Sequence, residues 1–260
     1  MIFGDVSLDI GDDAVATVEI HRPPHNYFDE ALIRSLADVF EALDAEPSCR
    51  ALVLASEGKS FCAGADFSKR SEQAGDEFES VGPSLLYKQA IRIFDNKKPI
   101  IAAIQGAAVG GGLGLALVAD FRVVAPEARF AANFVKLGIH PGFGLTHTLP
   151  RLIGVQRASL MFYTGRWVAA QEAVDWGLAD LLAPADALRH RAMTLATEIA
   201  GNAPLAVEST RATMRRGLAE AVKAQTGHEL AEQRRLAKTQ DHREGIRAVS
   251  ERRPGRFTGS

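Results

Sequence analysis

The chain has 260 residues, and its 30 Lys and Arg against 32 Asp and Glu give a formal net charge of −2. Its 47% hydrophobic and 24% charged residues are typical of a globular protein, which excludes a disordered, collagen-like or coiled-coil chain. The near-neutral charge argues against a nucleic-acid-binding protein, which usually carries a strong basic excess. A chain of this length can still form a single core.

Cysteine usage and hydropathy predict a soluble protein of the cytoplasm. Cys49 and Cys62 are the only cysteines, too few for a disulfide scaffold or a Cys-rich metal site. The acidic N-terminal stretch has no apolar core of the kind a secretory signal needs. No apolar run reaches the roughly 18 residues that a membrane span requires. We therefore expect no membrane partner.

The first half of the chain alternates strand and helix patterns. Four short apolar runs predict strands, at residues 15–20, 51–55, 99–104 and 121–125. Between the first two, Asp29 can cap a helix whose apolar positions, from Leu32 to Leu43, keep helical spacing. The run at 51–55 is continuous and predicts a strand buried on both faces. This alternation, without a hairpin signal, indicates an α/β fold with parallel strands.

From about Gln156 the strand signal nearly disappears. Helices are expected at 169–176, 185–200, 204–218 and 219–238. The polar, glycine-containing stretch at 69–84 predicts a surface loop. We expect a core over residues 1–195 and a helical C-terminal region over 196–260.

Two segments rich in small residues are candidates for a ligand site. Residues 60–67 (SFCAGADF) follow the strand at 51–55, and their small side chains let a ligand approach backbone N–H groups. Residues 106–114 (GAAVGGGLG) hold five of the 23 glycines and lie between a buried strand and a helix. The first N–H groups of a helix are unpaired and suit an oxyanion or phosphate, whereas tight helix–sheet packing explains the glycines equally well.

Together with other motifs, these segments resemble the enoyl-CoA hydratase/isomerase (crotonase) superfamily. The resemblance runs in collinear order over nearly the whole chain. Its motifs are His21-Arg22-Pro23, FCAGAD at 61–66, KPIIAAIQGAAVGGG at 98–112, ADFR at 119–122, LGI at 137–139, LPRLIG at 149–154, AVDWGL at 173–178, DHREGIRA at 241–248 and Arg253-Pro254.

The resemblance implies a crotonase-like spiral of ββα units with a helical C-terminal trimerisation region, assembled as a trimer or hexamer. It implies an acyl-CoA thioester as substrate, with coenzyme A entering as part of that substrate and no permanently bound cofactor. The backbone amides of Ala65 and Gly111 would form the oxyanion hole for a thioester enolate. Positions implied to contact coenzyme A are Arg22, His25, Ala63, Asp66 and Phe67, and those implied for the acyl pocket are Phe134 and Phe143.

The chain departs from the family's hydratases at both catalytic glutamates. Gly114 stands in the place of the first and Phe134 in the place of the second. Gly142 stands where some family isomerases and dehalogenases carry an aspartate. Glycine and phenylalanine can neither activate water nor deliver a proton, so standard hydratase activity is not expected.

His140 is the candidate replacement for the missing acid or base, because imidazole titrates near neutral pH. A hydrogen-bonded loop histidine is the alternative. A surface ion pair is the alternative for Arg22, and a plain turn is the alternative for His25 and Asn26. No metal site is expected.

The reaction itself stays open. Hydration by another pair of groups, isomerisation, C–C hydrolysis and decarboxylation are all compatible with an enolate-stabilising site. Decarboxylation needs the least acid–base machinery, because loss of carbon dioxide itself generates the enolate. A non-catalytic acyl-CoA-binding or regulatory protein is the alternative outside enzymes.

Overall fold

The computed structural model describes residues 1–66 and 82–260. Within them, a seven-stranded sheet has the order β1-β2-β3-β4-β6-β8-β11, and a four-stranded sheet has the order β10-β9-β7-β5. The strands of the larger sheet are β1 (Ile2–Phe3), β2 (Val6–Ile10), β3 (Val15–Ile20), β4 (Ala51–Ser56), β6 (Ile100–Ile104), β8 (Phe121–Val124) and β11 (Leu181–Leu182). Those of the smaller sheet are β5 (Ser60–Cys62), β7 (Ala107–Val109), β9 (Arg129–Ala131) and β10 (Trp167–Ala169).

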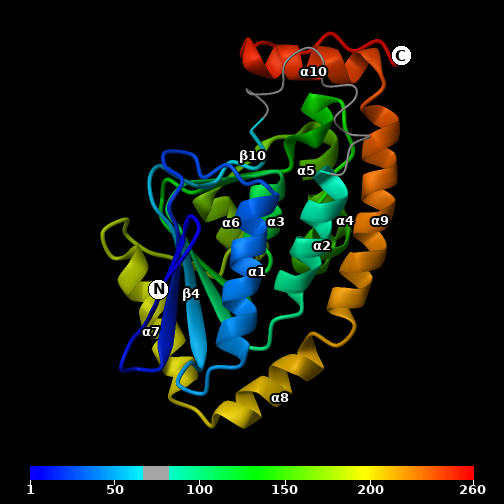
Figure 1. Ribbon diagram of the computed structural model, residues 1–260. Helices are drawn as coiled ribbons and strands as arrows, with labels where there is room; N and C mark the ends of the chain where they lie inside the picture. Colours follow the sequence, from blue (N-terminus) through cyan, green and yellow to red (C-terminus); the bar gives the residue numbers. More distant parts are fainter. Residues whose placement is uncertain (67–81) are drawn as a thin grey trace.

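The predicted parallel α/β core is confirmed from β3 onward. Strands β3, β4, β6, β8 and β11 pair in parallel, and helices cover both faces of this part of the sheet (Figure 1). Strand β4 shows why its apolar run is continuous. Leu52 and Leu54 belong to the core that includes helix α1, whereas Val53 packs on the other face with helix α7.

The expectation that the fold contains no hairpin was wrong at the N-terminus. Strands β1, β2 and β3 form an antiparallel meander. The turn between β2 and β3 is closed by hydrogen bonds from Gly11 N to Val15 O at 3.0 Å and from Ala14 N to Gly11 O at 3.1 Å. Residues Gly11 to Ala14 are thus a tight turn with a positive φ at Ala14, and their acidic composition obscured the turn signal.

The helices follow local signals in the sequence. Helix α1 (Glu30–Asp44) begins after Asp29, whose side chain accepts a hydrogen bond from Leu32 N at 2.9 Å, so the predicted N-cap is confirmed. The remaining α-helices are α2 (Gly82–Phe94), α3 (Gly111–Ala116), α4 (Leu145–Ile153), α5 (Val155–Thr164), α6 (Ala170–Trp176), α7 (Leu188–Ala200), α8 (Pro204–Met214), α9 (Leu218–Leu236) and α10 (Gln240–Ser250); a 3₁₀ helix, η1, covers Asn133–Leu137.

Two sequence-based boundaries need comment. Residues 82–84 of the surface loop expected at 69–84 belong to α2, and the rest of that stretch lies outside the described residues, as does Phe67. The domain boundary at 195/196 falls inside α7, whose Ala196 and Ala200 are buried against the sheet. We therefore propose that the C-terminal region begins after Ala200.

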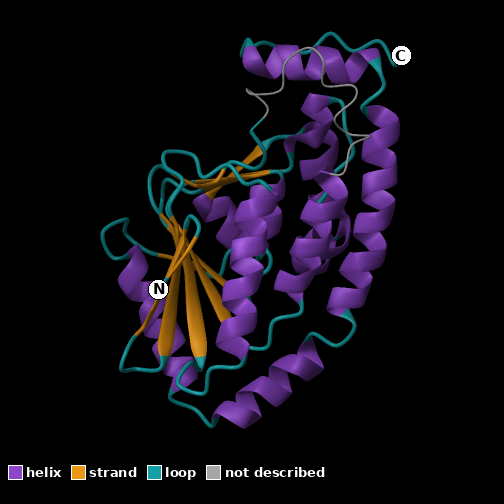
Figure 2. Ribbon diagram, viewed as in Figure 1, coloured by secondary structure: helices purple, strands orange, loops and turns teal. Residues whose placement is uncertain are grey.

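The C-terminal helices wrap around the core. Figure 2 shows the strands gathered on the side of the N-terminus and most helices on the other side. Helix α8 runs below the core, α9 runs along α2 and α4, and α10 lies across the far end (Figure 1). In the part of the chain that the structure describes, no helix is long and apolar enough to cross a bilayer.

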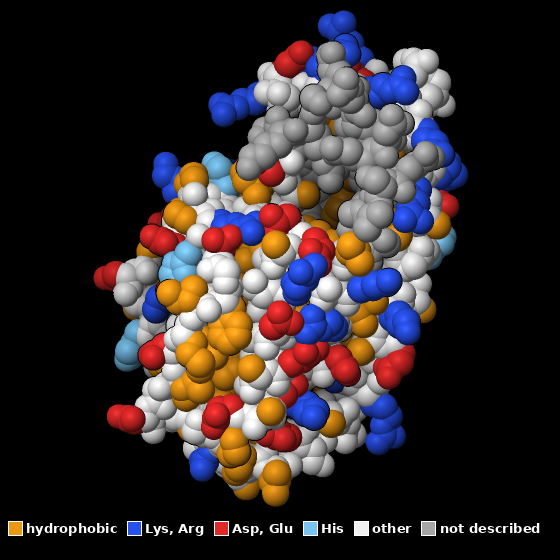
Figure 3. Space-filling view, viewed as in Figure 1, with side chains coloured by type: hydrophobic (Ala, Val, Ile, Leu, Met, Phe, Trp, Pro, Cys, Tyr) orange, Lys and Arg blue, Asp and Glu red, His pale blue; other side chains and the backbone are white. Residues whose placement is uncertain are grey.

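Acidic and basic side chains are mixed over much of one face of the molecule. In the lower and middle parts of the face shown in Figure 3, acidic and basic side chains are interspersed. This arrangement agrees with the near-neutral composition and gives these parts of the face no basic patch of the kind that binds a phosphate backbone.

Candidate active site

The two predicted ligand segments meet in the structure. Ala65 follows β5 and forms a parallel bridge with Phe28, and Gly111 is the first residue of α3. A Cβ added to Gly64 would lie 2.8 Å from the carbonyl oxygen of Val109 and 3.7 Å from the nitrogen of Gly111. Only glycine at position 64, whose φ is +82°, allows this close approach.

The amides of Ala65 and Gly111 are available as donors. Across residues 1–66 and 82–260, neither N–H donates to a protein oxygen. Their neighbours are bonded, since Phe28 N donates to Gly64 O at 2.9 Å and Gly110 N donates to Ala131 O at 2.8 Å. Both amides are therefore held by fixed backbone, as an oxyanion hole requires.

Phenylalanine rings surround this pair of amides. The ring of Phe28 would overlap any Cβ at Gly111, and the ring of Phe143 lies 3.6 Å from the same position. The centroids of these two rings are 5.6 Å apart. Phe134 Cζ lies 3.5 Å from a Cβ position at Gly110. We call Phe28, Phe134 and Phe143 the aromatic wall.

Phe143 of the aromatic wall fills the space beside Gly114. A Cβ at Gly114 would lie 2.7 Å from Cδ1 and 2.9 Å from Cβ of Phe143. Phe143 is only 1% exposed, and its ring also packs on Phe94 of α2 with centroids 6.3 Å apart. The predicted acyl-pocket residues Phe134 and Phe143 are thus both beside α3. Phe28 was not among the predicted site residues, because a single phenylalanine before a helix gives no functional signal.

Polar side chains occupy the space beside Gly142. A side chain at this position would overlap the hydroxyl of Tyr87 and lie 2.5 Å from Nε2 of Gln233. Tyr87 donates a hydrogen bond to Gln233 Oε1 at 2.8 Å, and Gln233 Nε2 donates to the carbonyl of His140 at 3.0 Å. Sequence reasoning missed both residues, which come from α2 and α9.

His140 is placed on the α9 side of its loop. Its Nδ1 lies 2.8 Å from the carbonyl oxygen of Pro141, and its ring meets the edge of His228 with centroids 5.8 Å apart. His228 is exposed on α9. The contacts that the structure gives for the His140 ring are therefore with its own loop and α9, and its catalytic role stays a prediction.

The residues predicted to contact coenzyme A lie around β5. Ala63 N donates to the carbonyl of His25 at 2.9 Å, and His25 Nδ1 is 3.4 Å from Ser60 Oγ. Asp66 follows Ala65 directly. These positions bring His25, Ala63 and Asp66 to the same segment as the Ala65 amide, and their contact with coenzyme A stays a prediction.

Arg22 and Asn26 build the turn that precedes this segment. Arg22 pairs with Asp5 at 2.6 Å and Asp29 at 2.9 Å, and these carboxylates keep the pKa of the guanidinium raised although partial burial opposes them. Asn26 is fully buried, and its Nδ2 donates to the carbonyls of Glu57 and Ser60 at 2.6 and 2.7 Å. The structure thus gives Asn26 the turn role, and the ion pair left open for Arg22 is present.

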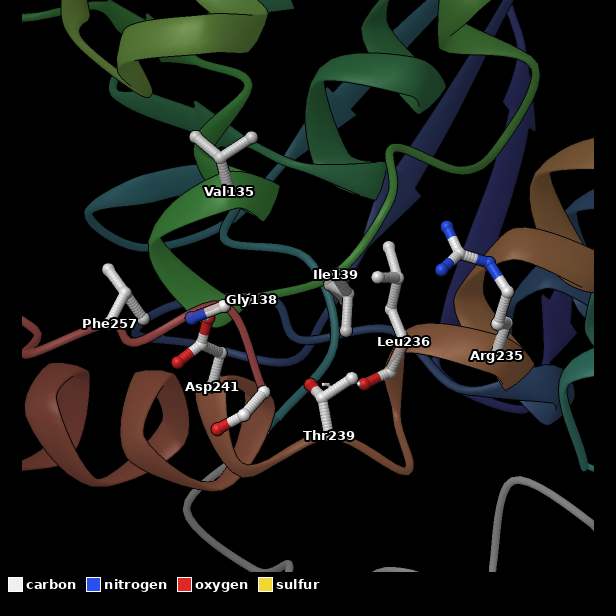
Figure 4. A pocket seen from close by; sticks show the side chains of 10 residues that line it. Val135, Gly138, Ile139, Arg235, Leu236, Thr239, Asp241 and Phe257 are labelled. Carbon is white, nitrogen blue, oxygen red and sulfur yellow. Dashed lines mark hydrogen bonds between the residues drawn. The ribbon is translucent and has the colours of Figure 1, made fainter.

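A separate open pocket lies where α9, α10 and the C-terminal segment meet the loop after η1 (Figure 4). Its volume is about 340 Å³, and Figure 4 shows Ile139, Leu236 and Thr239 close together in its lining. Thr239 Oγ1 donates to the carbonyl of Leu236 at 2.7 Å. Neither of the two free amides lines this pocket. Within the described residues, no cluster of three or more His, Cys, Asp or Glu side chains is arranged to hold a metal ion.

Comparison with known proteins identifies the family of this chain. The family model described as enoyl-CoA hydratase/isomerase matches residues 11–260. The chain is 35% identical over 254 residues to the putative enoyl-CoA hydratase/isomerase YngF of Bacillus subtilis (strain 168), covering 96% of both chains. It is 37% identical to a putative enoyl-CoA hydratase of Thermus thermophilus, covering 94% of this chain and 97% of the relative.

Solved structures agree. An enoyl-CoA hydratase/isomerase from Pseudoalteromonas atlantica T6c superimposes with a TM-score of 0.86 at 26% identity, covering 98% of this chain and 100% of the other. An enoyl-CoA hydratase from Bacillus anthracis gives 0.75 at 33% identity, covering 98% and 100%. Because the family model and the relatives span almost the whole sequence, the chain belongs to the enoyl-CoA hydratase/isomerase (crotonase) family.

Proposed function

We propose that this protein is an enzyme acting on acyl-CoA thioesters, whose Ala65 and Gly111 amides stabilise the oxygen of a thioester enolate. The observation that carries the proposal is the pair of free amides on two segments packed backbone to backbone. Each such donor contributes about 3–4 kcal/mol to transition-state stabilisation where its removal has been measured in other oxyanion holes.

Within this class, the aromatic wall favours a reaction that needs no carboxylate at positions 114, 134 or 142. Decarboxylation of a malonyl-type thioester meets this requirement. Loss of carbon dioxide leaves the C–C electron pair on the α-carbon, where it conjugates with the thioester carbonyl as an enolate. A proton from water then adds to that carbon, and the hydroxide left behind combines with the released carbon dioxide as bicarbonate. Apolar surroundings also weaken the hydration of the departing carboxylate, which favours its loss.

A non-catalytic acyl-CoA-binding protein is the second candidate. It is favoured by the contact of Phe143 with Gly114, which closes the space where a catalytic side chain would act. An acyl group would still find an apolar surface on the aromatic wall. Trimer or hexamer formation and a cytoplasmic location, implied by the resemblance, stay predictions.

A panel of thioesters separates these candidates. Purified protein is tested with malonyl-CoA, crotonyl-CoA and 3-hydroxybutanoyl-CoA, with thermal-shift binding measured beside turnover. We expect all three to bind and only malonyl-CoA to be turned over, to acetyl-CoA. Binding without turnover of any ester favours the second candidate, and hydration of crotonyl-CoA contradicts the proposed reaction. If no ester raises the melting temperature, the ligand class is wrong.

The role of the amides is tested by Gly111→Ala. The new methyl group overlaps the ring of Phe28, so either the ring or the start of α3 must move and the amide leaves its position. We expect loss of turnover and of thioester binding. Gly227→Ala is the matched control, because nothing lies within 4 Å of a Cβ at this exposed position on α9.

A further inference from the structure

We propose that Glu229 of α9 is a positioning residue, which holds Phe143 against α3 and so fixes the part of the aromatic wall that an acyl group meets. Only the statement that an acyl group meets this wall rests on the function proposed above. The placement of Phe143 by Glu229 is argued from contacts within the chain and can be tested without a ligand.

Glu229 binds the backbone directly after Phe143. Its Oε2 accepts a hydrogen bond from Gly144 N at 2.8 Å, and its Oε1 accepts from Thr146 N at 3.0 Å and Thr146 Oγ1 at 2.5 Å. Glu229 is 0% exposed, and this burial raises the pKa of its carboxyl while the hydrogen bonds from Thr146 and Gly144 oppose the rise. A buried carboxylate is costly unless it is fully bonded, so these contacts tie α9 firmly to this turn.

The turn that Glu229 binds has an unfavourable backbone. Phe143 has φ +64° and Gly144 has φ +72°, so two consecutive residues are left-handed. Such a conformation costs a non-glycine residue free energy and persists only where its surroundings impose it. The conformation of Phe143 directs its ring onto Gly111 and Gly114, and the next amide along the chain is the one that Glu229 holds.

The same face of α9 contacts the rest of this loop. Val222, Gln225, Glu229 and Gln233 follow one another at helical spacing. Val222 Cγ1 lies 2.8 Å from a Cβ position at Gly144, and Gln225 donates to Thr146 Oγ1 at 2.7 Å. Helix α9, which runs beside α4 in Figure 1, therefore supports the loop that carries Phe143.

A double-mutant cycle tests the placement by urea unfolding. In the wild-type background, Gly114→Ala forces Phe143 to move, because the new Cβ would lie 2.7 Å from its ring. In the Glu229→Gln background one carboxylate oxygen becomes an NH₂ group that faces a backbone N–H, so the turn is released. We expect Gly114→Ala to lower the urea concentration at the unfolding midpoint clearly less in the Glu229→Gln background than in the wild-type background. Additive losses overturn the proposal.

A second variant of the same hydrogen-bond network and a control variant complete the test. Thr146→Val keeps the carboxylate but removes one of its donors, and we expect it to shrink the Gly114→Ala effect in the same direction. If Glu229→Gln does not fold, Thr146→Val replaces it in the double-mutant cycle. Glu220→Gln, at an exposed position on the same helix, should leave the Gly114→Ala effect unchanged. A change with this control overturns the assignment to Glu229.

Calorimetric binding of octanoyl-CoA and free coenzyme A tests the acyl contact. For Glu229→Gln we expect octanoyl-CoA to bind about tenfold more weakly, equivalent to about 1.4 kcal/mol, with the affinity for free coenzyme A unchanged. Equal losses for both ligands contradict an acyl-specific wall. If the cycle shows coupling but neither ligand binds the wild type, the proposed function fails while the placement of Phe143 by Glu229 stands.

Discussion

The ring of Phe143 occupies the space into which a side chain at Gly114 would project. Its Cδ1, Cγ and Cβ atoms would lie 2.7 to 2.9 Å from a Cβ built at Gly114. Because real Cβ atoms do not approach other heavy atoms so closely, the glycine and the phenylalanine are sterically matched. A side chain larger than glycine at position 114 therefore has no room beside this ring.

This match predicts that Gly114→Glu alone will damage the protein. Overpacking of a tight interior costs about 1–3 kcal/mol, so we expect a lower free energy of unfolding and no hydration of crotonyl-CoA. The triple variant Gly114→Glu, Phe134→Glu, Phe143→Ala supplies both carboxylates and the missing room. We expect only the triple variant to hydrate crotonyl-CoA measurably. Hydration is monitored as the loss of absorbance of the conjugated thioester. A single Gly114→Glu variant of unchanged stability would contradict the match.

The close packing of β5 on α3 predicts a strong effect of Gly112→Ala. The added Cβ would overlap the carbonyl oxygen of Cys62 and lie 2.7 Å from its carbon. Backbone atoms cannot yield as a flexible side chain can, so we expect a loss of at least about 1–3 kcal/mol in urea unfolding. Gly227→Ala, in open space on α9, should instead gain up to about 1 kcal/mol. Equal effects of the two variants would show that the segments are less tightly packed.

The ion pair that holds the C-terminal segment is predicted to lose its contribution to stability in acid. Arg253 donates to Glu244 at 2.5 and 3.0 Å and lowers the pKa of this carboxyl to about 2 from the usual 4.5. A lowered pKa in the folded state stabilises it above pH 4.5, and this contribution is lost as the pH falls toward 2. The stability difference between wild type and Glu244→Gln should shrink over this range.

This difference is measured as the thermal midpoint at low salt, because both side chains keep some contact with solvent and salt screens their attraction. Glu220→Gln, at an exposed position on α9, is the control for a general loss of surface charge. A difference that stays constant from pH 4.5 to 2 would contradict the role of the Glu244 pair.

Much of the fold was predictable because local patterns control it. The Asp29 cap, the continuous apolar run of β4 and the helices after Gln156 each depend on residues close in sequence. The short strands of the smaller sheet were not predicted. Three-residue strands such as β5 and β7 are too short for a hydrophobic period, and their pairing depends on distant partners.

The parts of the candidate site that contain glycine motifs could be predicted from the sequence. The residues that tertiary packing brings to it could not. Residues 60–66 and 106–114 lie against each other because their small side chains permit close backbone approach, and their role as a common ligand site stays a prediction. Phe28 and Glu229 reach the site only through tertiary packing, Glu229 from 85 positions beyond Gly144 in the sequence. No local pattern distinguishes a buried glutamate on an amphipathic helix from a solvated one.

The two roles left open for His140, a general acid or base and a hydrogen-bonded loop histidine, predict losses of different size on substitution, and its ring contacts favour the loop role. Its Nδ1 is engaged with Pro141 O and its ring contacts His228, so His140→Ala should lower turnover of whichever thioester proves active by less than about tenfold. Removal of a general acid or base costs about 10²- to 10⁴-fold, and a loss of that size would instead assign His140 the catalytic role. Wild type and variant are compared between pH 5 and 8, since a catalytic imidazole would also contribute an ionisation to the pH profile that disappears in the variant. His228→Ala is the matched control, because it removes the ring contact while leaving the loop histidine in place.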